Sequence, residues 1–338
     1  AYEIRLSLVG WEMCIRDSIR AAAGFCIEAL DLLSLTAPEH ANHPAPRRSV
    51  LLHTAHLDTG GLQSVLLEQA AALAAAGHTV TIAVLRHTPR QLDLPPGVTV
   101  ELVTGSAVSR IDRWLEICRD HAVDVVIDHH ILYNENWAWY ALAALTADIP
   151  TIGWIHNFAL RPVFDANQRT SFLTTHLRLL WRVVTLSRAD VAFWKLRGLE
   201  HVVHLPNPLS PLALSALERQ PPRQYPDGRT ELVWWGRLDG PTKQVLQLVE
   251  TARELKARDV DFRLKIIGPA SNNLTPAEVR AYAVEQGVDE LIELVEELDS
   301  DSLTSELASA HLLVSTSAIE GAPLTLVCLL YTSPSPRD

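Results

Sequence analysis

Two basic side chains in the segment WWGRLDGPTKQ have the chemistry to neutralise a diphosphate. Arg237 directly follows a predicted buried strand, and Lys243 stands where the next helix is expected to begin. A guanidinium, an ammonium and the positive end of a helix together supply charge and hydrogen-bond donors for phosphate oxygens. Solvated surface charges are the alternative interpretation. Because both residues lie between a strand and a helix, a ligand site is an equally good interpretation.

A carboxylate stands near the end of the sequence, in the segment STSAIEGAPLTLV. Glu320 and Gly321 precede an apolar stretch that starts at Pro323, and this pattern is typical of the first turn of a helix. Backbone N–H groups at a helix start have no partner within the helix, so they and Glu320 could hold a polar ligand together. The alternative interpretation is that Glu320 only caps the helix.

Three histidines, His129, His130 and His156, each stand at the carboxyl end of a predicted strand. An imidazole there can hydrogen-bond a substrate hydroxyl or a phosphate, or act as a base. For each of them, a hydrogen bond that only supports the fold is an equally good interpretation. His156 is the strongest candidate, because a polar pair ends an otherwise apolar strand. No cysteine or carboxylate stands at metal-ligand spacing, so we expect neither a metal nor another cofactor.

A turn with paired glycines, Asp58-Thr59-Gly60-Gly61, follows the first predicted strand. Gly60 and Gly61 would let backbone N–H groups approach an anion or a sugar hydroxyl closely. An ordinary tight turn between a strand and a helix is the alternative interpretation. The motif G-x-G-x-x-G is absent, and the second strand ends in VLRH without an acidic residue, so NAD binding is disfavoured.

The elements that position these residues alternate between short apolar runs and helix-like segments. This pattern is typical of βαβ units and of a parallel sheet covered on both faces. It predicts a Rossmann-like domain over residues 49–205, a proline-rich interdomain linker over 206–228 and a second domain over 229–327. We therefore expect an α/β protein with two tandem Rossmann-like, doubly wound domains. Ligands in such sheets bind at the carboxyl ends of the strands.

Two predicted elements of the second domain, a helix and a strand, determine where its candidate residues lie. The pattern predicts a helix over residues 241–259, so that Lys243 falls in its first turn, and a strand over 310–316. A further helix is expected to begin just after Glu320.

Both ends of the sequence resemble translated sequencing-library adaptor. Codons can be chosen for residues 328–338 whose reverse complement, in another frame, encodes a peptide that matches residues 8–17 except at Trp11. We therefore expect residues 1–18 and 328–338 to be foreign to the natural protein, and the second domain to be truncated. Residues 19–48 form an extension to which we assign no role.

Composition sets limits on the class of function. A hydrophobic content of 48% with 20% charged residues describes a globular chain, and the formal net charge of −11 argues against nucleic acid as a partner. No apolar run reaches the roughly 18 residues of a membrane span. Cys26 and Cys118 stand alone outside the adaptor-like ends, which fits a reducing cytoplasm.

The order of these motifs resembles the family 4 glycosyltransferases of the GT-B fold. The paired glycines come first, followed by GRL with Lys243, by IIG ending at Gly268, and by STSAIEGAPLTLV. The segments VTLSRAD, with Ser187, and HLPNPLS, with Asn207, are also similar to that family, although Pro208 replaces the glycine expected at the hinge. The resemblance covers about residues 49–327.

The resemblance implies transfer of a hexose from a nucleotide-diphosphate donor, with retention at the anomeric carbon. Arg237 and Lys243 would neutralise the donor diphosphate in place of a metal, and His156 would face the donor sugar. Glu320 would hold sugar hydroxyls. The loop that follows Glu320 would supply backbone donors to the sugar (Gly321, Ala322, Pro323 and Leu324). A phosphate or the acceptor would lie against the paired glycines, Gly60 and Gly61. The family's second glutamate falls at Cys328, the first adaptor-like residue.

Two other functions remain open. A nucleotide-sugar epimerase would need acid and base carboxylates in the first domain, where Asp58 and Asp128 are the candidates. A non-catalytic nucleotide-sugar-binding relative is the other. A natural glutamate at position 328 would favour the enzyme, and a non-acidic residue would favour the binding protein.

The sequence leaves the acceptor open among a glycan, a lipid-linked hydroxyl and a small molecule. An apolar and basic stripe could touch a membrane surface that carries a lipid-linked acceptor (Arg161, Arg169, Arg178 and Arg182). We expect a cytoplasmic protein, which such an acceptor would bring to the inner face of the membrane.

Overall fold

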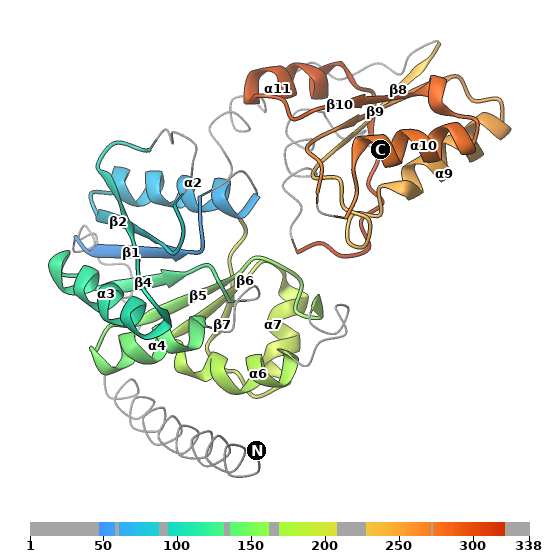
Figure 1. Cartoon of the computed structure of the whole chain (residues 1–338). Helices are drawn as coiled ribbons and strands as arrows, with labels where there is room; N and C mark the ends of the chain where they lie inside the picture. Colours follow the sequence, from blue (N-terminus) through green and yellow to red (C-terminus); the bar gives the residue numbers. More distant parts are fainter. Residues whose placement is uncertain are drawn as a thin grey trace, which may run out of the picture. The chain divides into compact units, whose positions relative to one another are not determined.

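The chain divides into two compact units between Pro206 and Asn207, and each has its own parallel sheet (Figure 1). A computed structural model describes residues 47–57, 61–87, 94–131, 136–161, 169–207, 228–271 and 273–321. The expected α/β class with two Rossmann-like domains is confirmed. The adaptor-like ends, the extension 19–46 and most of the proline-rich stretch lie outside the described residues.

The sheet of the first unit has seven parallel strands in the order β3-β2-β1-β4-β5-β6-β7. Each strand coincides closely with an apolar run in the sequence (β1 Ser49–Thr54, β2 Thr79–Val84, β3 Val98–Leu102, β4 Val125–Asp128, β5 Thr151–Ile155, β6 Arg182–Thr185, β7 Val202–His204). The chain winds outward from β1 in one direction and from β4 in the other. The strand order therefore reverses between β1 and β4, where ligands bind in open sheets.

Helices cover both faces of this sheet (α2 Gly61–Ala75, α3 Ala107–Asp120, α4 Trp137–Thr146, α6 Arg169–His176, the 3-10 helix η1 Leu177–Leu179, α7 Arg188–Lys195). Alternation along β1 explains how. Val50 and Leu52 pack with Leu66 of α2, while Leu51 lies on the other face with Trp114 of α3. Both faces are thereby removed from water.

The second unit has four parallel strands in the order β10-β9-β8-β11 (β8 Thr230–Trp235, β9 Phe262–Ile267, β10 Ile292–Val295, β11 Leu312–Leu313). Its helices again lie on two faces (α9 Leu246–Ala257, α10 Pro276–Glu285, the 3-10 helix η2 Asp289–Leu291, α11 Ser300–Ser309). Trp234 packs with α9 and α10, while Val233 packs with Leu307 of α11. Here the strand order reverses between β8 and β11.

Two predicted bounds in the second unit were wrong. The helix expected over 241–259 begins only at Leu246, so Lys243 lies in a turn before it. The reason is the backbone of Gln244, whose φ of +50° is left-handed and cannot continue a right-handed helix. The strand expected over 310–316 is ordered as β11 at Leu312–Leu313 alone.

Candidate functional site

The second unit brings Lys243 and Glu320 together at the point where its strand order reverses. Lys243 follows β8 and Glu320 follows β11, and Lys243 Nζ donates a hydrogen bond to Glu320 Oε1 at 2.5 Å. Each side chain is about one quarter exposed, so the ion pair remains open to solvent. These two residues were predicted from separate motifs, and the structure places them in direct contact.

Backbone contacts hold the two loops of this ion pair together. Ala318 N donates to Thr242 O at 2.9 Å, and Thr316 Oγ1 donates to Lys243 O at 3.0 Å. The segment after β11 is thus bonded to the turn after β8 on both sides of Lys243. The contact of Lys243 with Glu320 is therefore supported by hydrogen bonds between the two loops that do not depend on the two charges.

Arg237 lies at the same end of β8 but points to a different partner. Its guanidinium is 3.7 Å from Asp239 Oδ2, and its side chain is 66% exposed. Asp239 Oδ1 accepts a hydrogen bond from Thr242 N at 2.8 Å, so Asp239 connects Arg237 with the turn that carries Lys243. Within 228–271 and 273–321, Arg237 pairs with Asp239, whereas Glu320 pairs with Lys243.

The need for glycine at position 268 has a structural explanation that involves no ligand. Its φ is +144°, and a Cβ there would lie 1.9 Å from Gly236 O. Only glycine lets the chain after β9 pass this close to the chain after β8. Gly268 therefore shapes the loops at the carboxyl ends of the strands.

The other predicted loop residues are only partly described. Gly61 is the first residue of α2, and Gly321 is the last described residue after Glu320. Asn207 lies three residues after β7, and its Oδ1 is buried without a hydrogen-bond partner among the described residues. The predictions for Gly60, Ala322, Pro323 and Leu324, and for the helix after Glu320, lie outside the described residues.

A buried polar cluster lies in the first unit where β1 and β4 end. Asp128 Oδ2 is 3.2 Å from His53 Nδ1, while Asp128 Oδ1 accepts from the backbone N–H of His130 at 2.7 Å and lies 3.3 Å from His130 Nδ1. The side chains of His53 and Asp128 are 0% and 1% exposed. Both oxygens of Asp128 are therefore engaged, and this carboxylate faces protein rather than solvent.

The protonation of this cluster follows from burial. Burial lowers the pKa of His53 to about 4, with a further lowering by the charge of His130. Burial alone would raise the pKa of Asp128, but the charges and hydrogen bonds of His130 and His53 outweigh it and hold the pKa below its usual range. At neutral pH Asp128 is therefore an ionised carboxylate, and the neutral imidazole of His53 donates a hydrogen bond to it.

The same three side chains correct one expectation from the sequence. We expected no carboxylate at metal-ligand spacing, yet ligand atoms of His53, Asp128 and His130 all lie within 4.8 Å of one another. The sequence hid this because His53 is 75 residues from Asp128 and only the pairing of β1 with β4 joins them. Both histidines contact Asp128 through Nδ1, while their Nε2 atoms are buried without a hydrogen-bond partner among the described residues.

His129 and His156 form a second pair beside this cluster. Their Nδ1 and Nε2 atoms are 2.6 Å apart, and their rings stack with centroids 4.9 Å apart. Burial lowers the pKa of His156 to about 3 and that of His129 well below its usual range. Both imidazoles are neutral at pH 7, so a single proton lies in the hydrogen bond between them. The structure thus joins two of the three predicted histidines.

Sequence reasoning missed Asp190, which supports the loop after His156. Asp190 Oδ1 accepts a hydrogen bond from Ala159 N at 3.1 Å, and Asp190 N donates to Ser187 Oγ, the N-cap of α7, at 3.0 Å. Burial raises the pKa of this carboxyl. In the segment VTLSRAD, an acidic residue three positions after a serine is the available indication, but it is also typical of an ordinary helix start.

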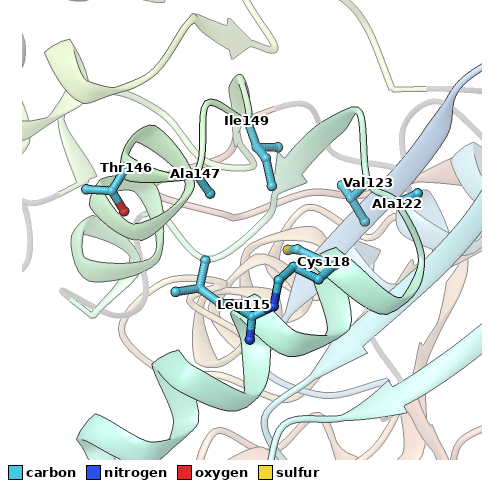
Figure 2. A pocket seen from close by; sticks show the side chains of 8 residues that line it. Leu115, Cys118, Ala122, Val123, Thr146, Ala147 and Ile149 are labelled. Atoms are coloured by element: carbon cyan, nitrogen blue, oxygen red, sulfur yellow. The ribbon is translucent and has the colours of Figure 1, made fainter.

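An apolar pocket of about 480 Å³ lies at the opposite end of the first sheet (Figure 2). Val123 and Ile149, which line it, precede β4 and β5, whereas the histidines follow these strands. Cys118 also lines it, and burial raises the pKa of its thiol to about 12, so the nucleophilic thiolate is absent at neutral pH. The pocket therefore lacks reactive groups.

Family models match both units. Residues 59–211 match the model described as Glycosyltransferase Family 4, and residues 229–330 match the model described as Glycosyl transferases group 1. The first match contains the histidines that follow β4 and β5. The second contains Arg237, Lys243 and Glu320. No curated protein matches the sequence.

Solved glycosyltransferase structures share the fold at low sequence identity. WaaG, a glycosyltransferase involved in lipopolysaccharide biosynthesis, is 16% identical, with a TM-score of 0.62 over 84% of this chain and 79% of that chain. Sucrose-phosphate synthase from Thermosynechococcus elongatus is 16% identical, with a TM-score of 0.65 over 85% and 80%. HepE from Anabaena in complex with UDP and glucose is 15% identical, with a TM-score of 0.61 over 85% and 79%.

These findings agree with the geometry. The two models together match about three quarters of the chain, and they divide it at the same place as the two sheets. The chain therefore belongs to the family 4-like glycosyltransferases of the GT-B fold.

Proposed function

We propose that the chain transfers a hexose from a nucleotide-diphosphate sugar to a hydroxyl acceptor, with retention of configuration at the anomeric carbon. The observation that carries this proposal is the placement of Lys243, Glu320 and Arg237 after β8 and β11. In parallel sheets this edge binds ligands. The similar structure of HepE contains UDP and glucose, which supports a donor of this class.

The proposed chemistry at the diphosphate is electrostatic. Negative charge builds up on the leaving diphosphate as the bond from the sugar breaks, and fixed cations then stabilise the transition state more than the ground state. Lys243 supplies a compact ammonium, and the exposed Arg237 supplies a guanidinium that can bind two phosphate oxygens. In this proposal, these two cations replace the metal that other glycosyltransferases use, and no cofactor takes part.

Glu320 and Gly321 are the residues of the second unit that we assign to the transferred sugar, and His156 is a separate candidate in the first unit. A carboxylate accepts hydrogen bonds from hydroxyls, so Glu320 can hold sugar hydroxyls once it leaves Lys243. Gly321 begins the loop whose backbone would supply donors. His156 is neutral because burial lowers its pKa to about 3, so it acts as a hydrogen-bond partner rather than as a cation.

The state of Asp128 favours transfer over epimerisation. An epimerase needs an accessible carboxylate that gives and takes protons, but Asp128 is 1% exposed and both its oxygens have partners. Asp58, the other candidate, lies outside the described residues. The exposed Arg237 instead suits a binding site for an anionic donor.

A lipid-linked acceptor is one of the acceptor classes that we propose, together with glycans and small molecules. Arg178 and Arg182 of the basic stripe are exposed, and Arg161 is half-buried; the side chain of Arg169 is outside the described residues. Exposed arginines attract anionic headgroups, which would hold a cytoplasmic enzyme at the inner membrane face. Within the described parts of the chain, no helix has the length and apolar character of a membrane span.

A donor screen tests the proposed function. Purified protein is incubated with UDP-, GDP- and ADP-hexoses, and binding and release of the nucleoside diphosphate are measured. We expect one base to be preferred, and the hexose transferred to water to be released with the anomeric configuration of the donor, as read by NMR before it mutarotates.

The matched variants are Lys243→Ala and Lys265→Ala. Lys265 forms a similar ion pair, with Glu306 at 2.5 Å, on the same sheet. Lys243→Ala should lower kcat/KM about 100- to 1,000-fold, which corresponds to a loss of about 2.7–4 kcal/mol of transition-state stabilisation. Lys265→Ala should leave kcat/KM unchanged. A folded protein that binds none of these donors contradicts the proposal, and an inverted product contradicts its stereochemical part.

A further inference from the structure

We propose that Glu320 determines specificity for a sugar-bearing donor against the free nucleoside diphosphate. This inference rests on the proposed function, because it assigns a second task to the same site. Glu320 is the counter-ion of Lys243 in the structure, at 2.5 Å. A diphosphate that binds Lys243 therefore competes with this carboxylate for the ammonium and is repelled by its charge, and the two kinds of ligand differ in what they offer Glu320 in return.

The ion pair is positioned before any ligand binds. The turn with Lys243 and the segment that leads to Glu320 are joined by Ala318 N to Thr242 O and by Thr316 Oγ1 to Lys243 O. Since the backbone holds both residues, separation of the pair is a rearrangement of two side chains that are each one quarter exposed. Because the two loops stay joined by these bonds, Glu320 then remains close to a phosphate that binds Lys243.

The chemistry of the two ligands explains the discrimination. A donor sugar attached to the distal phosphate carries hydroxyl groups, which donate hydrogen bonds to the freed carboxylate of Glu320. A free nucleoside diphosphate ends in charged phosphate oxygens, which only accept hydrogen bonds and repel the carboxylate. It therefore separates Lys243 from Glu320 without giving the carboxylate a new partner.

The same asymmetry favours release of the product. After transfer, the sugar leaves with the acceptor and Glu320 loses its hydroxyl partners. Glu320 then competes again with the diphosphate for the ammonium of Lys243, in the arrangement that the structure shows. The preference for the sugar-bearing ligand is thus also a preference against the product of the reaction.

Equilibrium binding to three variants tests this inference. The probes are UDP, GDP and ADP, each with its hexose derivative, and inorganic pyrophosphate. Glu320→Gln removes the charge and keeps the shape, whereas Glu320→Asp keeps the charge on a shorter side chain. The matched control is Glu306→Gln, which neutralises the equivalent ion pair with Lys265 at 2.5 Å. Circular dichroism confirms that each variant is folded.

For Glu320→Gln we expect the affinity for the free nucleoside diphosphate and for pyrophosphate to rise about three- to tenfold. The affinity for the nucleotide sugar should rise less, so the preference for the sugar-bearing ligand falls. Glu320→Asp should still disfavour the free diphosphate. Glu306→Gln should change neither affinity.

Two outcomes would overturn the inference in distinguishable ways. If the wild type binds nucleotide sugars but Glu320→Gln leaves the ratio of the two affinities unchanged, the role of Glu320 is wrong and the proposed function stands. If the wild type binds neither the nucleotides nor pyrophosphate, the proposed function fails together with this inference.

Discussion

At the scale of single residues, burial keeps three imidazoles of the first unit neutral. The pKa of His53 is lowered to about 4, that of His156 to about 3, and that of His129 well below its usual range. In an unfolded chain each would have a pKa of about 6.5. Below that pH the unfolded state takes up protons that the folded state refuses, so acid favours unfolding.

The first unit should therefore lose stability between pH 7.5 and 5.5. Each of these histidines contributes a loss of roughly 1 kcal/mol at pH 5.5, because burial holds its folded pKa below that pH. Hydrogen exchange of peptides from β1 and β4 under mild urea measures the loss. Peptides from β8 and β9, where the described residues include no buried histidine, are the internal control. Equal protection of β1 and β4 at both pH values would contradict the assigned pKa directions.

The pair His129 and His156 leads to a prediction about one proton. His129 Nε2 is buried without a hydrogen-bond partner, so a proton there would leave an unsatisfied N–H. We expect His129 to carry its proton on Nδ1 and donate it to His156 Nε2, at 2.6 Å. His156 then carries its own proton on Nδ1, which is the donor that our proposed function assigns to the sugar. Nitrogen-15 NMR of the two imidazoles distinguishes this arrangement from the reverse.

His129→Phe tests whether His129 positions His156 through their hydrogen bond. The substitution keeps an aromatic ring beside Trp154 and His156 but removes the hydrogen bond to His156 Nε2. We expect about a fivefold loss of kcat, equivalent to one hydrogen bond, with little change of KM. The NMR signals of His156 should become those of mixed tautomers. An unchanged tautomer in His129→Phe would show that His129 only fills space.

At the scale of elements, the apolar runs predicted nearly every strand because parallel strands are buried on both faces. The loops were harder. Because the backbone of Gln244 is left-handed, α9 begins only at Leu246. A glutamine in the sequence gives no indication of this conformation. His53 and Asp190 were missed for a related reason: one lies inside an apolar run and the other in a helix start, and their partners are distant in sequence.

Gly268 shows how a loop depends on one backbone contact. Gly268→Ala should destabilise the second unit by about 3 kcal/mol or more, because the new Cβ would lie 1.9 Å from Gly236 O at a φ of +144°. Gly240→Ala, where no atom lies within 4 Å of the added Cβ, should be nearly neutral. Urea unfolding of both variants gives the comparison. Equal stabilities would mean that the loops after β8 and β9 are less close than described.

At the scale of the whole molecule, the order of the motifs along the chain indicated the fold better than any single motif did. Lys243 and Glu320 are 77 residues apart, yet both predicted loops meet because parallel strands end at one edge of a sheet. The fold class and the two loops with their candidate residues could be predicted from the sequence, whereas the ion pair between them appeared only in the structure. The acceptor could not, since the similar solved structures described above are only 15–16% identical and include different enzymes.

The net charge of −11 leads to a prediction about metal dependence. An acidic protein repels an anionic donor overall, so binding must depend on local cations. If Arg237 and Lys243 supply them, EDTA should leave donor binding and turnover unchanged, and added Mg²⁺ or Mn²⁺ should raise turnover by less than about twofold. Turnover that requires a divalent ion, or a metal bound at His53, Asp128 and His130, would contradict the assignment.

A crystal structure with the preferred nucleoside diphosphate tests the central claim most directly. We predict phosphate oxygens within hydrogen-bonding distance of Lys243 Nζ and of the guanidinium of Arg237, with Glu320 moved from its present 2.5 Å contact with Lys243. Phosphates bound away from both cations, with that ion pair still closed, would contradict the account.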